Sequence, residues 1–177
     1  MTTATHNTRA TRLEHVERHI RFENEHNLSA VMSTFGPDPR YDDEPSDEHH
    51  IGRDGVLGYY QSLLKVMPDL HIDVQRRHVG DDAVLMECRI SGTHRGTWRG
   101  LPATGRQVSF PLCAVYTFTD EGELAGERIY YDRATVLAQL GVFRDPESPS
   151  GRLLILLNHP LTLGRAAWEA ISRRRAH

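Results

Sequence analysis

The period of the hydrophobic pattern changes at Pro68, and this change constrains the fold more than any other feature of the chain. Before Pro68, apolar residues recur with the spacing of an amphipathic helix, in the series Val56, Tyr59, Tyr60, Leu63, Leu64 and Met67. After Pro68, apolar and polar residues alternate, as they do in half-buried strands. Helices followed by long consecutive strands with short turns indicate an α+β fold. We expect the helices to cover one face of a curved antiparallel sheet.

Four strands are predicted after Pro68, over residues 71–79, 83–98, 108–118 and 124–132. The second strand carries Met86 and His94 on its apolar side. The third carries Phe110, Tyr116 and Phe118 on its apolar side. These apolar sides are expected to face the core.

The segment before the third helix contains two further predicted helices. Residues 1–11 are polar and are expected to fray. An amphipathic helix then begins at Arg12, with Leu13, Val16 and Ile20 on one face. Asn27 is expected to cap a short helix over residues 28–35, which Gly36-Pro37 ends. A short extended piece at 41–43 and an acidic loop at 44–50 follow.

The chain ends in a segment of different composition. A short closing helix is predicted over residues 134–140, so the main domain spans residues 12–143. Residues 144–151 have the composition of a linker, and residues 152–177 form a broken, basic, amphipathic helical tail. Such a tail could dock on its own domain, on a sister subunit or, as a less favoured alternative, on a membrane surface.

Composition excludes several functional classes. The chain has 177 residues and a formal net charge of −3, which argues against nucleic acid as the main partner. No apolar run is long enough to span a membrane, and the N-terminus has no apolar signal region. Cys88 and Cys113 form neither a disulfide framework nor a zinc motif, so a reducing cytoplasm is the expected compartment. Phosphate-binding, dinucleotide-binding and nucleophile-elbow motifs are absent from the sequence, which disfavours nucleotide chemistry and acyl transfer.

Several short motifs occur together in a characteristic order. They are Gly52-Arg53-Asp54-Gly55, Met67-Pro68-Asp69-Leu70, Gly92-Thr93-His94-Arg95-Gly96, Leu101-Pro102-Ala103-Thr104-Gly105, Pro111, Tyr116-Thr117-Phe118 and Tyr131-Asp132 with Leu137 and Gln139-Leu140-Gly141. In this order the chain resembles the SnoaL-like polyketide and ester cyclases of the nuclear transport factor 2-like superfamily, over residues 12–142. The resemblance implies a cone with a deep pocket between the curved sheet and three helices. It also implies acid/base catalysis without metal or other cofactor, by an aspartate that falls on Asp132.

The chain departs from the family pattern at two places. Arg128 stands where the family often has a tryptophan, and the strand that often carries a histidine offers Tyr116 and Phe118 instead. The family's fold also serves isomerases, epoxide hydrolases and non-catalytic binders, so the fold alone does not fix the reaction.

The predicted site is centred on the last strand. Arg128, Tyr130 and Asp132 share one side of this strand. In a pocket, Asp132 could remove a proton next to a carbonyl group, and Tyr130 or Tyr116 could hold the enolate oxygen. The alternative for Asp132 is a cap of the following helix.

Further candidates surround this centre. His94 is either a buried structural histidine or a proton donor facing Asp132. The predicted substrate-binding residues are Tyr41, His50, Met86, Trp98, Phe110, Tyr116, Phe118 and Arg128. No metal site is predicted: the histidines at 49 and 50 fit no standard ligand set, and His15, His19 and His26 are expected to form a solvated or interface stripe.

These features predict a cofactor-independent enzyme of the cyclase type that acts on a small, largely apolar carbonyl compound. The alternatives are isomerisation, dehydration or epoxide hydrolysis in the same pocket, or a non-catalytic ligand-binding or assembly domain. A homodimer is expected through the outer sheet face, on the apolar character of Ser109, Pro111, Cys113, Val115, Ile129 and Tyr131.

Overall fold

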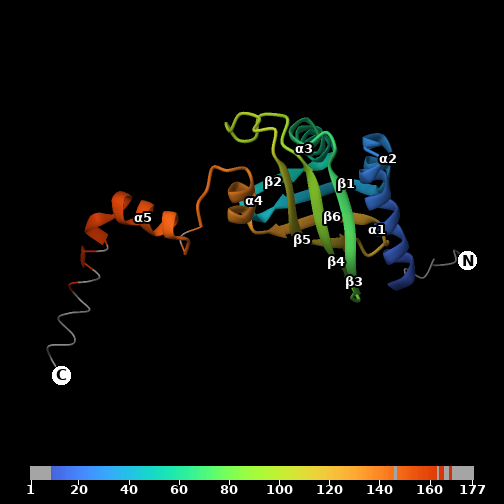
Figure 1. Cartoon of the computed structure of the whole chain (residues 1–177). Helices are drawn as coiled ribbons and strands as arrows, with labels where there is room; N and C mark the ends of the chain where they lie inside the picture. The colour runs from blue at the N-terminus through green and yellow to red at the C-terminus, as the bar shows by residue number, and fades with distance from the viewer. Residues whose placement is uncertain (1–8, 146, 163, 166–167, 169–177) are drawn as a thin grey trace, which may run out of the picture. The chain divides into compact units, whose positions relative to one another are not determined.

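A computed structural model describes residues 9–145, 147–162, 164–165 and 168. The chain divides into two units that meet between Leu140 and Gly141. The first unit contains the sheet and four α-helices, and it has the α+β architecture that the change of hydrophobic period predicts (Figure 1).

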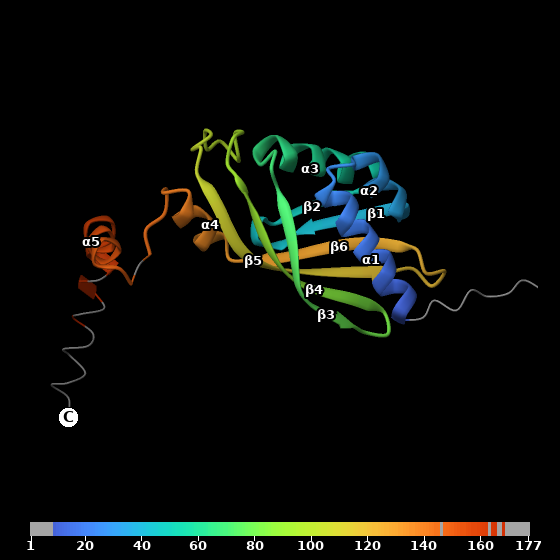
Figure 2. The same cartoon turned by 45° about the vertical axis from the view of Figure 1, so that its right-hand side comes forward.

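The sheet of the first unit has six strands in the order β2-β1-β6-β5-β4-β3. Their bounds are Phe35–Asp43 for β1, Glu48–Ile51 for β2, His71–Val79 for β3, Ala83–Thr93 for β4, Gln107–Phe118 for β5 and Leu124–Tyr131 for β6. All neighbouring pairs are antiparallel except β1 and β6, which are parallel. The sheet bends strongly, and α1, α2 and α3 lie on one side of it (Figure 2).

Each helix of this unit begins or ends where local chemistry requires. The helix α1 spans Arg9–Asn24, α2 spans Leu28–Thr34, α3 spans Gly52–Val66 and α4 spans Arg133–Gln139. Asn27 caps α2 by accepting a hydrogen bond from the Ala30 amide at 3.1 Å. Asp132 caps α4 in the same way, from the Ala134 amide at 2.9 Å. The helix α3 ends at Val66, with Met67 as its C-cap, because the residue before a proline, here Pro68, is disfavoured in a helix.

The first part of the sheet departs from the sequence prediction. The segment 35–51, expected as one extended piece and an acidic loop, forms β1, a short 3-10 turn at Glu44–Ser46 and β2. The sheet therefore has six strands rather than four, and the pairing of β1 with β6 makes it mixed rather than wholly antiparallel. The helix predicted over residues 28–35 ends at Thr34, because Phe35 is already extended and begins β1, the strand that also contains Gly36 and Pro37.

The side of β6 that faces the helices also differs from the prediction. Leu112, Ala114 and Tyr116 of β5 lie directly opposite Tyr131, Ile129 and Glu127 of β6. Directly opposed residues point to the same side of a sheet, so Glu127, Ile129 and Tyr131 face the helices. Arg128 and Tyr130 face away from them.

This register changes the outer face of the sheet. Ile129 and Tyr131, which were expected on the outer face, belong to the inner face instead. The outer face carries Arg128 and Tyr130 at the corresponding places, with Arg89 and Glu87 on β4. It is therefore more polar than predicted, and the homodimer through this face stays a prediction.

The second unit contains α5, which spans Pro149–Asn158. Ser148 caps this helix by accepting a hydrogen bond from the Gly151 amide at 3.0 Å. The helix begins inside the predicted linker at 144–151, and much of the predicted tail beyond residue 165 lies outside the described residues. None of the described helices combines the length and the apolar character that crossing a membrane requires.

Candidate functional site

A cavity of about 680 Å³ opens between the concave face of the sheet and the helices. Aliphatic and aromatic side chains of α3, β4, β5 and α4 form most of its wall, among them Leu63, Ile90, Phe110, Val136 and Leu140. A largely apolar cavity with a few converging polar groups is the usual form of a small-molecule site. The polar groups of this cavity gather in two places, one buried and one nearer the surface.

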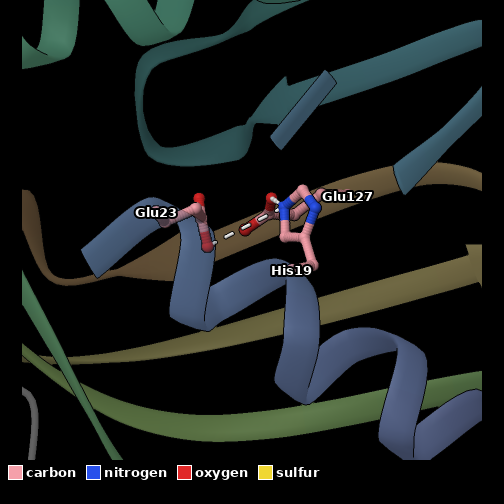
Figure 3. A group of neighbouring side chains, drawn as sticks. All are labelled: His19, Glu23 and Glu127. Atoms are coloured by element: carbon pink, nitrogen blue, oxygen red, sulfur yellow. Dashed lines mark ion pairs between the residues drawn. The ribbon is translucent and has the colours of Figure 1, made fainter. Parts of the chain in front are cut away.

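The buried polar group, called the carboxylate cluster below, consists of His19 and Glu23 on α1, Tyr60 on α3 and Glu127 on β6. Figure 3 shows three of these side chains, those of His19, Glu23 and Glu127. The Tyr60 hydroxyl donates a hydrogen bond to Glu127 Oε2 at 2.9 Å and lies 3.1 Å from His19 Nε2. The same nitrogen lies 3.6 Å from Glu127 Oε2 and 3.8 Å from Glu23 Oε2. Two carboxyl groups thus converge on one imidazole beside a largely apolar cavity.

Burial perturbs the titration of Glu23. Its side chain is only 8% exposed, and desolvation raises its pKa well above the ordinary glutamate value. The nearby charge of Glu127 raises the pKa of Glu23 further. A side-chain hydrogen bond with Tyr60 opposes these two effects, but the pKa of Glu23 still lies well above its ordinary value.

The tyrosines around this cluster keep their protons. Burial raises the pKa values of Tyr41, Tyr60 and Tyr116 well above 10, and the charge of Glu127 contributes in each case. All three hydroxyl groups are consequently available as hydrogen-bond donors beside the cavity.

His94, at the end of β4, also lines the cavity and is 1% exposed. Gly96, two residues after His94, lies so close to the carbonyl group of Lys65 that a Cβ atom would not fit at this position. The backbone amide of Thr104 donates to His94 Nδ1 at 3.2 Å. An amide can only donate, so the neutral ring carries its hydrogen on Nε2. That buried Nε2 has no hydrogen-bond partner among the described residues.

The second polar group lies nearer the surface. Tyr59 donates to Asp43 Oδ2 at 3.2 Å, and Arg99 forms an ion pair with Glu48 at 2.9 Å. Burial raises the pKa of Asp43, although the hydrogen bond from Tyr59 opposes this effect. His50 stacks near Tyr59, with ring centroids 4.7 Å apart. These residues form a charged rim around part of the cavity.

The structure brings together six of the predicted site residues. His94, Tyr116, Phe110, Trp98, His50 and Tyr41 all line the cavity. Met86 is fully buried but lies in the core rather than in the cavity wall. Phe118 packs against Arg12 and His15 instead, away from the cavity.

The predicted position of Asp132 in the pocket is wrong. Asp132 is exposed, and its carboxylate accepts hydrogen bonds from the Ala134 amide at 2.9 Å and from the Thr135 hydroxyl at 2.5 Å. The Thr135 hydrogen bond lowers the pKa of Asp132. The strand ends at Tyr131, and the chain turns into α4 at this point, so strand alternation does not carry Asp132 into the cavity.

The predicted positions of Arg128 and Tyr130 in the pocket are also wrong. Arg128 lies on the outer face, where it contacts Asp42 at 3.3 Å and Glu44 at 3.1 Å. Tyr130 is 44% exposed and lies outside the cavity wall. The register with β5 points both side chains away from the helices.

The predicted histidine stripe on α1 is wrong as well. His19 is completely buried within the carboxylate cluster. The neighbouring His15 and His26 bond to the backbone carbonyl groups of Thr34 and Leu70, each at 2.8 Å. None of the three is a free surface ligand.

Within the described residues, His19, Glu23 and Glu127 form the one group whose ligand atoms could converge on a metal ion, with all atoms within 4.8 Å of one another. The Tyr60 hydroxyl already bonds Glu127 Oε2 and lies within hydrogen-bond distance of His19 Nε2. Hydrogen bonds and ion pairs therefore connect these groups to one another.

Comparison with known proteins identifies the family. A family model described as SnoaL-like polyketide cyclase matches residues 13–140, and the chain belongs to this family. A search of curated proteins finds no match.

Solved structures share the fold at low sequence identity. A putative SnoaL-like polyketide cyclase from Jannaschia sp. CCS1 has a TM-score of 0.68 at 20% identity, over 81% of this chain and 98% of that chain. AclR, a putative hydroxylase from Streptomyces galilaeus, has a TM-score of 0.67 at 23% identity, over 77% and 100% of the two chains. A protein of ketosteroid isomerase-like fold from Catenulispora acidiphila, in complex with trimethylamine, has a TM-score of 0.63 at 20% identity, over 77% and 98%. The protein thus has the nuclear transport factor 2-like fold.

Proposed function

We propose that this protein binds a small, largely apolar carbonyl compound in its cavity and transforms it by acid/base catalysis, with Glu127 as the general base. Membership of the polyketide cyclase family supports a reaction of the cyclase type. The observation that carries the proposal is the position of Glu127, a buried carboxylate in the wall of a largely apolar cavity. Such a carboxylate can remove a proton next to a carbonyl group, whereas Asp132 lies outside the cavity.

His94 complements this base. Its Nε2 hydrogen lies at the cavity wall without a partner among the described residues. A buried donor without a partner is unfavourable until a ligand oxygen accepts its hydrogen. We assign His94 the role of hydrogen-bond donor to the substrate oxygen, on which negative charge develops as the proton leaves the carbon.

Epoxide hydrolysis receives less support from the arrangement. The arginine and aspartate that the sequence suggested for it, Arg128 and Asp132, both lie outside the cavity, and the arginine in the cavity wall, Arg99, pairs with Glu48 and Asp43 at the rim. A non-catalytic binding domain remains the second candidate, because a fold of this kind can bind a ligand without changing it.

The test combines binding with hydrogen exchange. Steroid ketones, terpenoid ketones and aromatic diketones are first screened for an increase in Tm. The α-hydrogen atoms of the compounds that bind are then followed by NMR in heavy water. We expect exchange that slows by ~10²–10⁴ in Glu127→Gln, the usual loss for a general base, and that is unchanged in Asp132→Asn.

Both alternative results are informative. Binding without exchange in the wild-type protein would overturn the catalytic proposal in favour of a binding domain. Exchange lost in Asp132→Asn but kept in Glu127→Gln would return the catalytic role to Asp132.

A further inference from the structure

A row of side chains crosses the concave face of the sheet, and the proposed function uses only its centre. Tyr41 on β1 and Tyr116 on β5 both lie directly opposite Glu127 on β6, and all three line the cavity. Glu127 is therefore flanked in the sheet by a tyrosine on each side. Tyr60 on α3 adds a third ring, since its hydroxyl donates to Glu127 Oε2 at 2.9 Å and its ring centroid lies 5.4 Å from that of Tyr41. These three tyrosines and Glu127 are called the tyrosine row below.

Glu23 on α1 brings a second carboxyl group to the tyrosine row. Its side chain is 8% exposed and lines the cavity. One of its carboxyl oxygens lies within 4.8 Å of a carboxyl oxygen of Glu127 (Figure 3). A side-chain hydrogen bond with Tyr60 accompanies this approach. Two carboxyl groups and three aromatic rings thus share one part of the cavity wall.

The positive charge that usually balances buried carboxyl groups is scarce beside them. Within the described part of the chain, no lysine or arginine forms an ion pair with Glu23 or Glu127. The basic group beside them is His19, which approaches both. A protonated His19 can balance one carboxylate, so the other needs a proton or a cationic ligand.

The cavity as a whole is biased in the same direction. Its described wall contains five carboxyl groups, those of Glu23, Asp43, Glu48, Asp54 and Glu127. The cationic side chains among these described wall residues are Lys65, which is exposed, and Arg99, which already pairs with Glu48 and Asp43 at the rim. Complementarity of charge therefore favours a cationic ligand over an anionic one.

A buried donor in the same cavity constrains another part of the ligand. His94 is 1% exposed, and its Nε2 has no hydrogen-bond partner among the described residues. The proposed function assigns this donor to the carbonyl oxygen of the substrate. The ligand thus needs an acceptor oxygen for His94 and a positive group for the carboxyl pair.

We propose that the tyrosine row and Glu23 form a recognition site for an ammonium group, so that the ligand of this cavity is an apolar amino ketone. Aromatic rings attract a cation through their negative faces, and carboxylates add charge-assisted partners. Because carboxyl oxygens of Glu23 and Glu127 approach within 4.8 Å, the ammonium group beside Glu23 lies within a few bonds of the carbon that Glu127 deprotonates. This inference rests on the proposed function for the carbonyl half of the ligand and adds the charged half.

Two probes of the same shape test the charge without any chemistry. The compound trans-4-(trimethylammonio)cyclohexanol carries a permanent positive charge, whereas trans-4-tert-butylcyclohexanol has the same shape and no charge. Calorimetric titration of the wild-type protein at neutral pH should show at least ~10-fold tighter binding of the ammonium probe, the gain expected for a cation among buried aromatic rings. Equal or tighter binding of the neutral probe, or no binding of either at millimolar concentration, would overturn the proposal.

Variants locate the charge that the probe detects. Glu23→Gln and Glu127→Gln keep the size of the side chain, and each should weaken binding of the ammonium probe by ~10-fold while changing that of the neutral probe by less than about twofold. Glu87→Gln is the matched control, because Glu87 pairs with His78 outside the cavity wall and should leave both affinities unchanged. A preference for the ammonium probe that survives both cavity variants would show that the acids of the rim attract it, and it would overturn the site assigned here.

Proton release gives a second readout of the same contact. Burial and the charge of Glu127 raise the pKa of Glu23, although the hydrogen bond with Tyr60 opposes them. The titratable groups that surround Glu23 are His19 on its own helix, Tyr60 on α3, Tyr41 on β1, Cys88 on β4, Tyr116 on β5 and Glu127 on β6. A permanent cation beside Glu23 favours its ionised form, so binding should release protons. Titrations in two buffers of different ionisation enthalpy measure this release, and a release that is unchanged in Glu23→Gln would contradict the contact.

The outcomes distinguish this inference from the proposed function. Exchange of α-hydrogen atoms in neutral ketones tests the base and needs no ammonium group. Such exchange without a preference for the ammonium probe would overturn the amino ketone assignment and leave Glu127 as the base. The opposite result, a preference for the ammonium probe without exchange in any ketone, including the amino ketone tropinone, would keep the ammonium site and overturn the catalytic proposal.

Discussion

Tyr116 on β5 and Glu127 on β6 lie directly opposite each other, and both side chains are buried in the wall of the cavity. Burial and the neighbouring charge of Glu127 raise the pKa of Tyr116. The carboxylate is thus surrounded by phenols that stay protonated, including Tyr60, which donates to it directly. The hydrogen bond from Tyr60 thus provides the buried carboxyl group of Glu127 with a donor.

Removal of the Tyr60 hydroxyl should therefore impair both stability and activity. Tyr60→Phe deletes the hydrogen bond to Glu127, and a bond to a charged group usually contributes about 1.5–3 kcal/mol. We expect a loss of unfolding free energy in this range and slower α-hydrogen exchange. Urea unfolding and NMR exchange measure the two effects.

Tyr59→Phe is the control for this prediction. Tyr59 is the preceding residue on α3, but its hydroxyl bonds Asp43 near the rim. The Tyr59→Phe variant should lose stability, but it should catalyse α-hydrogen exchange faster than the Tyr60→Phe variant does. Equal activities of the two variants would contradict a specific role for the bond to Glu127.

The sequence predicts the fold class and the main strands, but it assigns the wrong side of β6 to the cavity. The resemblance to the family predicts that Asp132 faces the pocket, and strand alternation then predicts the same for Arg128 and Tyr130. Ile129 indicates the opposite side of the strand as the buried one, because an aliphatic residue on a strand usually faces the core. Glu127 shares that side with Ile129.

The sequence of α1 also indicates two buried polar residues. Val16 and Ile20 define the apolar face of this helix, and His19 and Glu23 fall three residues after each of them. Polar residues at positions on an apolar helix face are more informative than exposed ones, because their burial requires partners. The partner on β6 depends on long-range packing, however, which helical spacing alone does not give.

The hydrophobic pattern does not predict the strands β1 and β2, and there is a physical reason for this. The strand β1 contains Pro37, Pro39 and three aspartates, residues that are depleted in strands. Its pairing with β6 and β2 overrides this weak local preference. It brings Tyr41 and Asp43 to the cavity.

The raised pKa of Glu23 predicts how stability varies with pH. Between the unfolded glutamate pKa of about 4.3 and the raised folded value, the folded protein binds more protons than the unfolded chain. The contribution of Glu23 to stability is thus complete below the unfolded pKa and is lost as pH rises through the folded pKa. Glu23→Gln should remove this part of the decline. Urea unfolding of both proteins from pH 5 to 8.5 measures it, and parallel curves would contradict the shift.

Asp42 should show the opposite dependence. Burial opposes ionisation of Asp42, but hydrogen bonds from Arg40 and His49 outweigh it and lower the pKa of Asp42. Asp42→Asn should destabilise the protein at pH 7 by about 1–3 kcal/mol, since three basic side chains lose the negative charge that they share, although one acceptor oxygen remains. The stabilisation is present above the unfolded pKa and is lost as pH falls through the folded value, so the difference should shrink in acid. The exposed Asp38 on the same strand is the control, and Asp38→Asn should change little.

The capping role of Asp132 gives a further prediction. Asp132→Asn keeps a side-chain acceptor for the Ala134 amide and should leave Tm and activity nearly unchanged. Asp132→Ala removes the cap and should lower Tm while leaving α-hydrogen exchange intact. A fall in exchange that exceeds the loss of folded protein would contradict a purely structural role.

The first unit should fold without the second. The contact boundary lies at Leu140, and the family match ends at the same residue. A chain cut after Phe143 keeps Leu140, which is 3% exposed and lines the cavity. We expect it to unfold cooperatively and to retain ligand-induced stabilisation. A chain cut after Gln139 is the matched control. It lacks Leu140 and should lose about 1.5–3 kcal/mol, the usual contribution of a buried leucine side chain. Guanidinium unfolding measures the stability of the two truncated chains. Loss of cooperative unfolding in the chain that ends at Phe143 would show that residues after Phe143 belong to the folded core.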